Sequence, residues 1–146
     1  MHNKLLLALM ALALWTCTPS TPTAPTPPIV GGDQDEHGCK GSAGYTWSAL
    51  KGECIRIFES GIRLDPKASG LDQSLSAFVV FKSDTADAQA EVFLPGNKVG
   101  LLFAKMPDNG AGTWALDTLT LTQWKGMFTL EGKSKTILYQ GAAKAN

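Results

Sequence analysis

Short apolar runs separated by polar turns fill the C-terminal half of the chain. The turns contain Pro, Gly, Asn and Asp, and the runs recur about every ten residues, which is typical of antiparallel strands. In Leu119-Thr120-Leu121-Thr122 the alternation is strict, which places the leucines on the core face and the threonines outside. The sequence predicts about seven strands within 67–141, rolled into a small barrel that leaves no open edge. The runs lie at 76–82, 89–94, 98–105, 113–116, 119–124, 127–130 and 136–139.

A single uninterrupted apolar run precedes this region, at the N-terminus. Lys4 is followed by apolar residues from 5 to 15. The run is shorter than the roughly 20 residues that a membrane-spanning helix needs, but it fits the apolar part of a secretory signal peptide. We therefore expect residues 1–16 to be a signal peptide and the protein to be exported.

The residues around Cys17 indicate how the leader is removed. Leu14-Trp15-Thr16-Cys17 resembles the lipobox of bacterial lipoproteins, in which Leu stands three residues before the cysteine that receives the lipid. Thr18 then resembles lipoproteins that are sorted to the outer membrane, where the protein would face the periplasm or the cell surface. The alternative is cleavage after the Ala-Leu-Ala of 11–13, which would release a free periplasmic or secreted protein.

Cysteine arithmetic favours lipidation. The chain has three cysteines, and an odd cysteine in an oxidising compartment needs a role. If Cys17 carries lipid, Cys39 and Cys54 remain to pair with each other. The Pro/Thr-rich segment 18–28 cannot bury a core and prefers extended conformations, so residues 17–32 are expected to form a disordered tether between membrane and domain.

The segment 33–66 is predicted to be a small module closed by the disulfide. A loop of this size is stabilised by about 3 kcal/mol when it is cross-linked. Residues 54–58 alternate as a strand should, with Ile55 and Ile57 on one face. Zinc held by Cys39, Cys54 and His37 is a weaker alternative, because the spacing is unusual and a fourth ligand is missing, so no metal is expected.

Four polar residues, 33 and 35–37, open this module. The carboxylates of Asp33, Asp35 and Glu36 stand close together but lack the Gly and Glu of an EF-hand. We expect a solvated acidic turn that forms salt bridges to Arg56 or Arg63.

The same segment carries a motif. The stretch DEHGC, then SAGYTWS, then Cys54-Ile55-Arg56 resembles a module found in small uncharacterised bacterial secreted proteins and lipoproteins. The resemblance covers about a quarter of the chain and implies no established activity.

Charge and composition exclude some functions. Thirteen basic side chains balance thirteen acidic ones, and nucleic-acid binding needs clustered positive charge, so no nucleic-acid partner is expected. Ser48, His37 and Asp35 could be named as catalytic groups, but no nucleophile elbow or metalloprotease helix surrounds them. We therefore predict that the protein is not an enzyme and needs no cofactor.

The C-terminal part has a second resemblance, to the lysozyme-inhibitor lipoproteins of bacterial envelopes, which are small lipid-anchored barrels. Asn109-Gly110 and Trp114 stand roughly where that family has Ser-Gly and Tyr, and Lys125-Gly126 matches its Lys-Gly. The resemblance implies that loops 107–112 and 125–126 bind a glycosidase cleft. The alternative is that Lys125-Gly126 is only a hairpin turn and Trp124 a core aromatic.

The predicted function is therefore a non-catalytic module at the cell envelope that binds a protein or a glycan. A lysozyme-inhibitor-like protein is one alternative, and a structural component of an envelope complex is another. Residues 142–146 are expected to be a disordered tail.

Overall fold

The structure, a computed structural model, describes residues 33–83, 88–107 and 112–143. The predicted signal peptide, Cys17, the tether and the last residues of the predicted tail lie outside these ranges. Among the residues described, no helix has the length and apolar character needed to cross a membrane.

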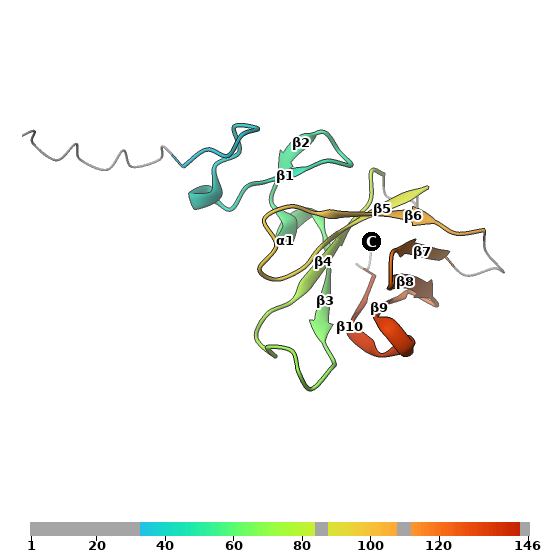
Figure 1. Cartoon of the computed structure of the whole chain (residues 1–146). Coiled ribbons are helices and arrows are strands. Elements are labelled where there is room, and N and C mark those ends of the chain that lie inside the picture. The colour runs from blue at the N-terminus through green and yellow to red at the C-terminus, as the bar shows by residue number, and fades with distance from the viewer. Residues whose placement is uncertain (1–32, 84–87, 108–111, 144–146) are drawn as a thin grey trace, which may run out of the picture.

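Eight antiparallel strands close into a barrel (Figure 1). Each strand pairs with the next one along the chain, and the last pairs with the first. The predicted fold class, mainly β with a small antiparallel barrel, is confirmed, and every predicted run from 76 onward overlaps a strand. The strands are β3 (Ile62–Pro66), β4 (Ala77–Val80), β5 (Gln89–Phe93), β6 (Leu101–Lys105), β7 (Gly112–Leu116), β8 (Leu119–Trp124), β9 (Met127–Glu131) and β10 (Ile137–Ala142).

The barrel closes through β3, which the sequence-based boundary at residue 66 had placed in the N-terminal module. Tyr139 and Gln140 of β10 pair with Pro66 and Asp65 of β3. The two backbones pass very close at this seam, because a Cβ on Gly141 would lie 2.0 Å from the carbonyl oxygen of Arg63. β3 is thus the eighth strand of the barrel, in addition to the seven strands predicted from the apolar runs.

The interior is filled by the inward residues of all eight strands. Trp114 is the largest fully buried side chain, and the ring of Phe81 lies 5.2 Å from it and 5.7 Å from Phe128, centroid to centroid. Leu121 is buried and Leu119 packs against the same cluster, as the Leu/Thr alternation predicts. The barrel therefore has a packed aromatic and aliphatic core.

A stapled module, residues 33–55, precedes the barrel. It contains the short helix η1 (Gly41–Ala43) and the hairpin of β1 (Thr46–Ser48) and β2 (Glu53–Ile55). Cys39 and Cys54 form the predicted disulfide, with Cα atoms 5.5 Å apart.

The strand predicted over 54–58 ends early. β2 stops at Ile55, and the helix α1 (Ile57–Ser60) leads into β3. Ile55 and Ile57 still lie in one apolar cluster, which explains their alternation, whereas Phe58 is exposed. A second short helix, η2 (Lys133–Lys135), joins β9 to β10.

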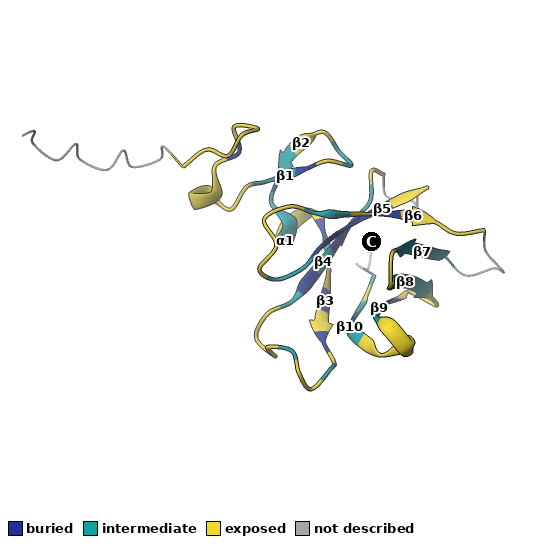
Figure 2. Cartoon of the chain, in the orientation of Figure 1, coloured by how far each residue is buried: buried dark blue, intermediate teal, exposed yellow. Residues whose placement is uncertain are grey.

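The stapled module lies against the outside of the barrel, beside β4 and β5 (Figure 1). Ile55 packs with Val80 and Phe93, whose side chains point away from the barrel interior. β4 and β5 are consequently buried on both faces, as the dark ribbon of β4 shows (Figure 2).

Candidate functional site

The turn 125–126 lies at the end of the barrel where β6 ends and β7 begins. Lys105, the last residue of β6, and Gly112, the first of β7, are therefore at the same end as this turn. Asn109 and Gly110 lie outside the described residues. The turn itself is described in full.

The turn between β8 and β9 has a fixed geometry. Trp124 pairs with Met127, and the two residues between them have φ values of 47° at Lys125 and 78° at Gly126. Positive φ at both central residues is the type I′ pattern, which matches the twist of paired strands. The backbone N–H of Ala143 donates to the carbonyl of Gly126 over 2.6 Å. This bond ties the turn to the residue that follows β10.

We call Trp124, Lys125, Gly126 and Met127 the tip. Trp124 is 60% exposed and Met127 is 40% exposed, although both are apolar. The ammonium nitrogen of Lys125 lies 5.8 Å from the centroid of the Trp124 ring, within the range of a cation–π contact. Among the described residues Lys125 has no ion pair with a carboxylate, so the tip combines an exposed indole with a positive charge that is free to meet a partner.

Trp114 lies elsewhere. The resemblance made it a possible binding residue in the place of the family's Tyr, but it belongs to β7 and its side chain is fully buried in the barrel core. Its cross-strand partner is Leu121, which faces inward, and this pairing sets the orientation of the indole. The alternative interpretation made Trp124 a core aromatic, but its side chain is exposed. The same interpretation made Lys125-Gly126 a hairpin turn, and the structure shows that turn.

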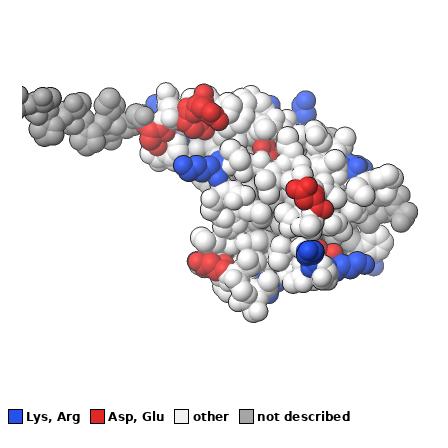
Figure 3. Space-filling view, viewed as in Figure 1, with Lys and Arg blue, Asp and Glu red and all other residues white. Residues whose placement is uncertain are grey.

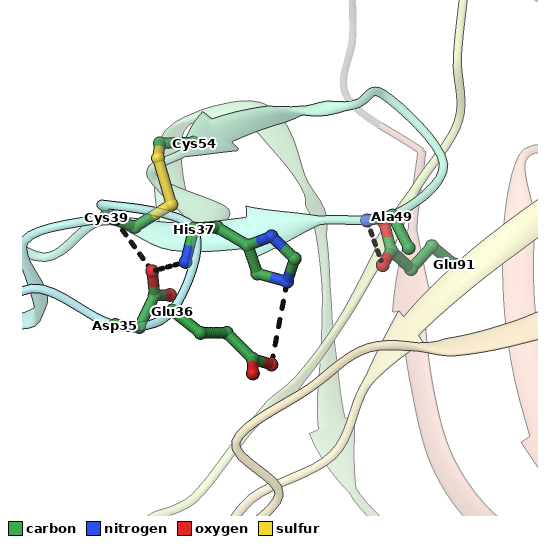
Figure 4. Close-up of polar contacts among 7 residues, drawn as sticks. All are labelled: Asp35, Glu36, His37, Cys39, Ala49, Cys54 and Glu91. Atoms are coloured by element: carbon green, nitrogen blue, oxygen red, sulfur yellow. Dashed lines mark hydrogen bonds and ion pairs between the residues drawn. A yellow bond between two sulfur atoms is a disulfide. The ribbon is translucent and has the colours of Figure 1, made fainter.

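The DEHGC motif builds the first turn of the stapled module. The carboxylate of Asp35 accepts hydrogen bonds from the backbone N–H groups of His37, over 2.9 Å, and Cys39, over 2.8 Å (Figure 4). This Asx turn directs Cys39 toward Cys54. Gly38 has a φ of 83°, a conformation that favours glycine.

The aromatic residues of the second motif pack beside this turn. The His37 ring stacks on Trp47 with centroids 4.3 Å apart, and the Arg56 guanidinium lies 4.8 Å from the centroid of the Tyr45 ring. Arg56 also pairs with Glu59 over 3.1 Å. The motif residues His37, Tyr45, Trp47 and Arg56 therefore contact one another or a residue close by in the sequence.

The prediction that the acidic turn forms salt bridges to Arg56 or Arg63 is wrong. The Ser42 hydroxyl and backbone N–H both donate to the carboxylate of Asp33, and these bonds hold the pKa of that carboxyl below its usual 3.8. Arg63 pairs with Asp65 of its own strand, over 2.8 Å. Asp33 and Asp35 thus accept hydrogen bonds from nearby N–H and O–H groups, and Glu36 lies 3.7 Å from the His37 ring nitrogen. Figure 3 shows acidic and basic side chains in small separate groups over one face of the protein.

The structure contains a buried polar site that no sequence motif predicted. Glu91 on β5 is fully buried, and its carboxylate accepts a hydrogen bond from the Ser48 hydroxyl. It also accepts one from the backbone N–H of Ala49 over 3.0 Å (Figure 4). The backbone N–H of Leu50 adds a longer contact of 3.4 Å. The available signal was a single carboxylate inside the apolar run of β5.

The three residues named as possible catalytic groups do not converge. Ser48 donates to Glu91, His37 stacks on Trp47, and Asp35 accepts backbone bonds. Cys39 and Cys54 are bonded to each other, so neither is free to bind zinc. Within the described ranges, no group of three His, Cys, Asp or Glu side chains is placed to hold a metal ion.

No protein-family model matches the chain, and neither a curated protein nor a solved structure matches it.

Proposed function

We propose that this protein is a non-catalytic binding module of the bacterial cell envelope, attached to the membrane by a lipid on Cys17, that binds a partner through the tip. The observation that carries the proposal is the exposure of Trp124 on a hydrogen-bonded two-residue turn. A large exposed indole loses little conformational freedom on binding, and Trp is enriched among the residues that dominate interface energies. Met127 widens the apolar contact and Lys125 adds a charge.

The partner that fits the tip best is a protein with a carboxylate-lined cleft, and the specific version is a lysozyme. Glycosidases of this kind place paired carboxylates in an open cleft. Lys125 is the first central residue of the turn between β8 and β9, so its ammonium would meet such carboxylates while Trp124 and Met127 contact the rim of the cleft. The closed barrel and the Lys-Gly turn are what this chain shares with the lysozyme-inhibitor lipoproteins it resembles.

Inhibition of lysozyme tests this version. The chain from residue 18 onward should slow the lysis of bacterial cell walls by lysozyme, measured as loss of turbidity. Lys125→Ala and Trp124→Ala should each weaken inhibition about tenfold or more, as expected when a central interface residue is truncated. Lys133→Ala, which removes a lysine from η2 at the other end of the barrel, is the matched control and should inhibit normally. Unchanged lysis at a large excess of the unaltered protein would exclude lysozyme as the partner.

The lipid anchor has its own test. Mass spectrometry of the protein exported from a bacterial host should show a diacylglyceryl group on the peptide that begins at Cys17. Cys17→Ser should abolish that added mass and release the protein from the membrane fraction. A mass equal to that of the chain without lipid, or an N-terminus directly after Ala13, would contradict lipidation. The protein would then be free in the periplasm or secreted.

A further inference from the structure

The outer face of β4 and β5 has the composition of a core. In both strands the inward residues fill the barrel, while Phe78, Val80, Glu91 and Phe93 point outward. The outward face of a barrel strand is ordinarily polar because water covers it. Here the stapled module covers it, through Ile55 and the turn between β1 and β2.

One carboxylate makes the polar contact between the two parts. The Glu91 carboxylate has left water entirely and accepts hydrogen bonds from Ser48, Ala49 and Leu50, which are the last residue of β1 and the two that follow. The Ser48 oxygen also accepts a bond from the backbone N–H of Lys51, over 3.1 Å, so the turn is organised around this point. Gly100 leaves room for the carboxylate, because a Cβ there would lie 2.5 Å from Glu91 Cγ.

The free energy of this contact is the difference between the cost of burying the Glu91 carboxylate and the gain from its hydrogen bonds. Removing a carboxylate from water is costly, and the three hydrogen bonds offset that cost only while the module is closed. When the module opens, Glu91 and the N–H groups return to water together. The apolar part of the contact is the packing of Ile55 with Val80 and Phe93, and the barrel ladder is complete without the module, because its eight strands pair only with one another.

We propose that the stapled module is a strap that opens and closes as a unit over β4 and β5 while the barrel stays folded, and that Glu91 is its latch. Opening would uncover an apolar surface formed by Phe78, Val80 and Phe93. The disulfide lies entirely within residues 33–55, so it holds the strap together in both states without tying it to the barrel. This inference does not depend on the tip or on its partner.

Native-state hydrogen exchange tests the proposal on the full exported chain, purified in detergent. In the unaltered protein, the amides of β1 and β2 should exchange faster than those of β7 to β9, because local opening needs less free energy than global unfolding. Glu91→Gln keeps the size of the side chain but removes its charge and points amide hydrogens at donors. It should speed exchange in β1 and β2 about tenfold to a hundredfold and leave β7 to β9 unchanged.

Two further variants make the result decisive. Glu131→Gln, the same change on the outer face of β9, should leave exchange in the module unchanged. Ser48→Ala removes one donor and keeps the other two, so it should speed exchange in the same amides by a smaller factor, and it guards against loss of folding in the first variant. The proposal is overturned if Glu91→Gln and Ser48→Ala accelerate the module and the barrel equally, or if they accelerate neither.

Discussion

Trp114→Ala is expected to lower the free energy of unfolding by about 3–5 kcal/mol, which is the usual range for truncating a large aromatic side chain in a core. The side chain is fully buried and contacts Phe81 and Phe128 across the barrel interior. A closed barrel cannot collapse into the space, because its eight strands are fixed to one another by the ladder. Such a loss is a large part of the 5–15 kcal/mol that stabilises a typical domain.

Urea unfolding followed by circular dichroism measures this loss. Trp124→Ala is the matched control, since it makes the same substitution on the exposed indole and should change stability by no more than about 0.5 kcal/mol. The dependence of free energy on urea should be the same in both variants, because the surface exposed on unfolding hardly changes. Equal stability losses at the two positions would contradict the assignment of Trp114 to the core and Trp124 to the surface.

The barrel could be predicted because most of its strands alternate and are bounded by turns. The Leu/Thr alternation in β8 and the Lys125-Gly126 pair fix both a strand and its turn by local chemistry alone. β3 was missed although Ile62 and Leu64 alternate with Arg63 and Asp65, because the alternation is only four residues long and ends at Pro66. Its place is set by pairing with β10, more than seventy residues away, which no local pattern reveals.

The sites were harder to predict for the same reason. The alternation in β8 already turns Trp124 outward, but 112–116 has no clear alternation of its own, and Trp114 faces the core through its pairing with Leu121. The Ser48–Glu91 contact joins residues 43 positions apart. The disulfide could be predicted because counting cysteines limits the choice of pairs, whereas a buried carboxylate can meet donors from anywhere in the chain.

Replacing both Cys39 and Cys54 by alanine is expected to cost the stapled module about 3 kcal/mol, the value for a closed loop of this length. Apart from its contact with the barrel, the module has little else to hold it. Cys39, Ser48 and Ile55 are its only buried residues, and its hairpin pairs only three residues from each strand. An isolated two-stranded hairpin is marginally stable in water, so the cross-link supplies most of its order.

The loss should fall on the module and leave the barrel folded, since both cysteines precede β3. Limited proteolysis should cut the double variant within 33–55 roughly a hundred times faster, the rate change that corresponds to about 3 kcal/mol when opening is at equilibrium. The unaltered protein treated with a reductant should behave like the variant. Cys17→Ala, which removes a cysteine outside the described fold, should be cut no faster than the unaltered protein. If the barrel strands become sensitive together with the module, the two parts unfold as one unit and the disulfide stabilises the whole domain.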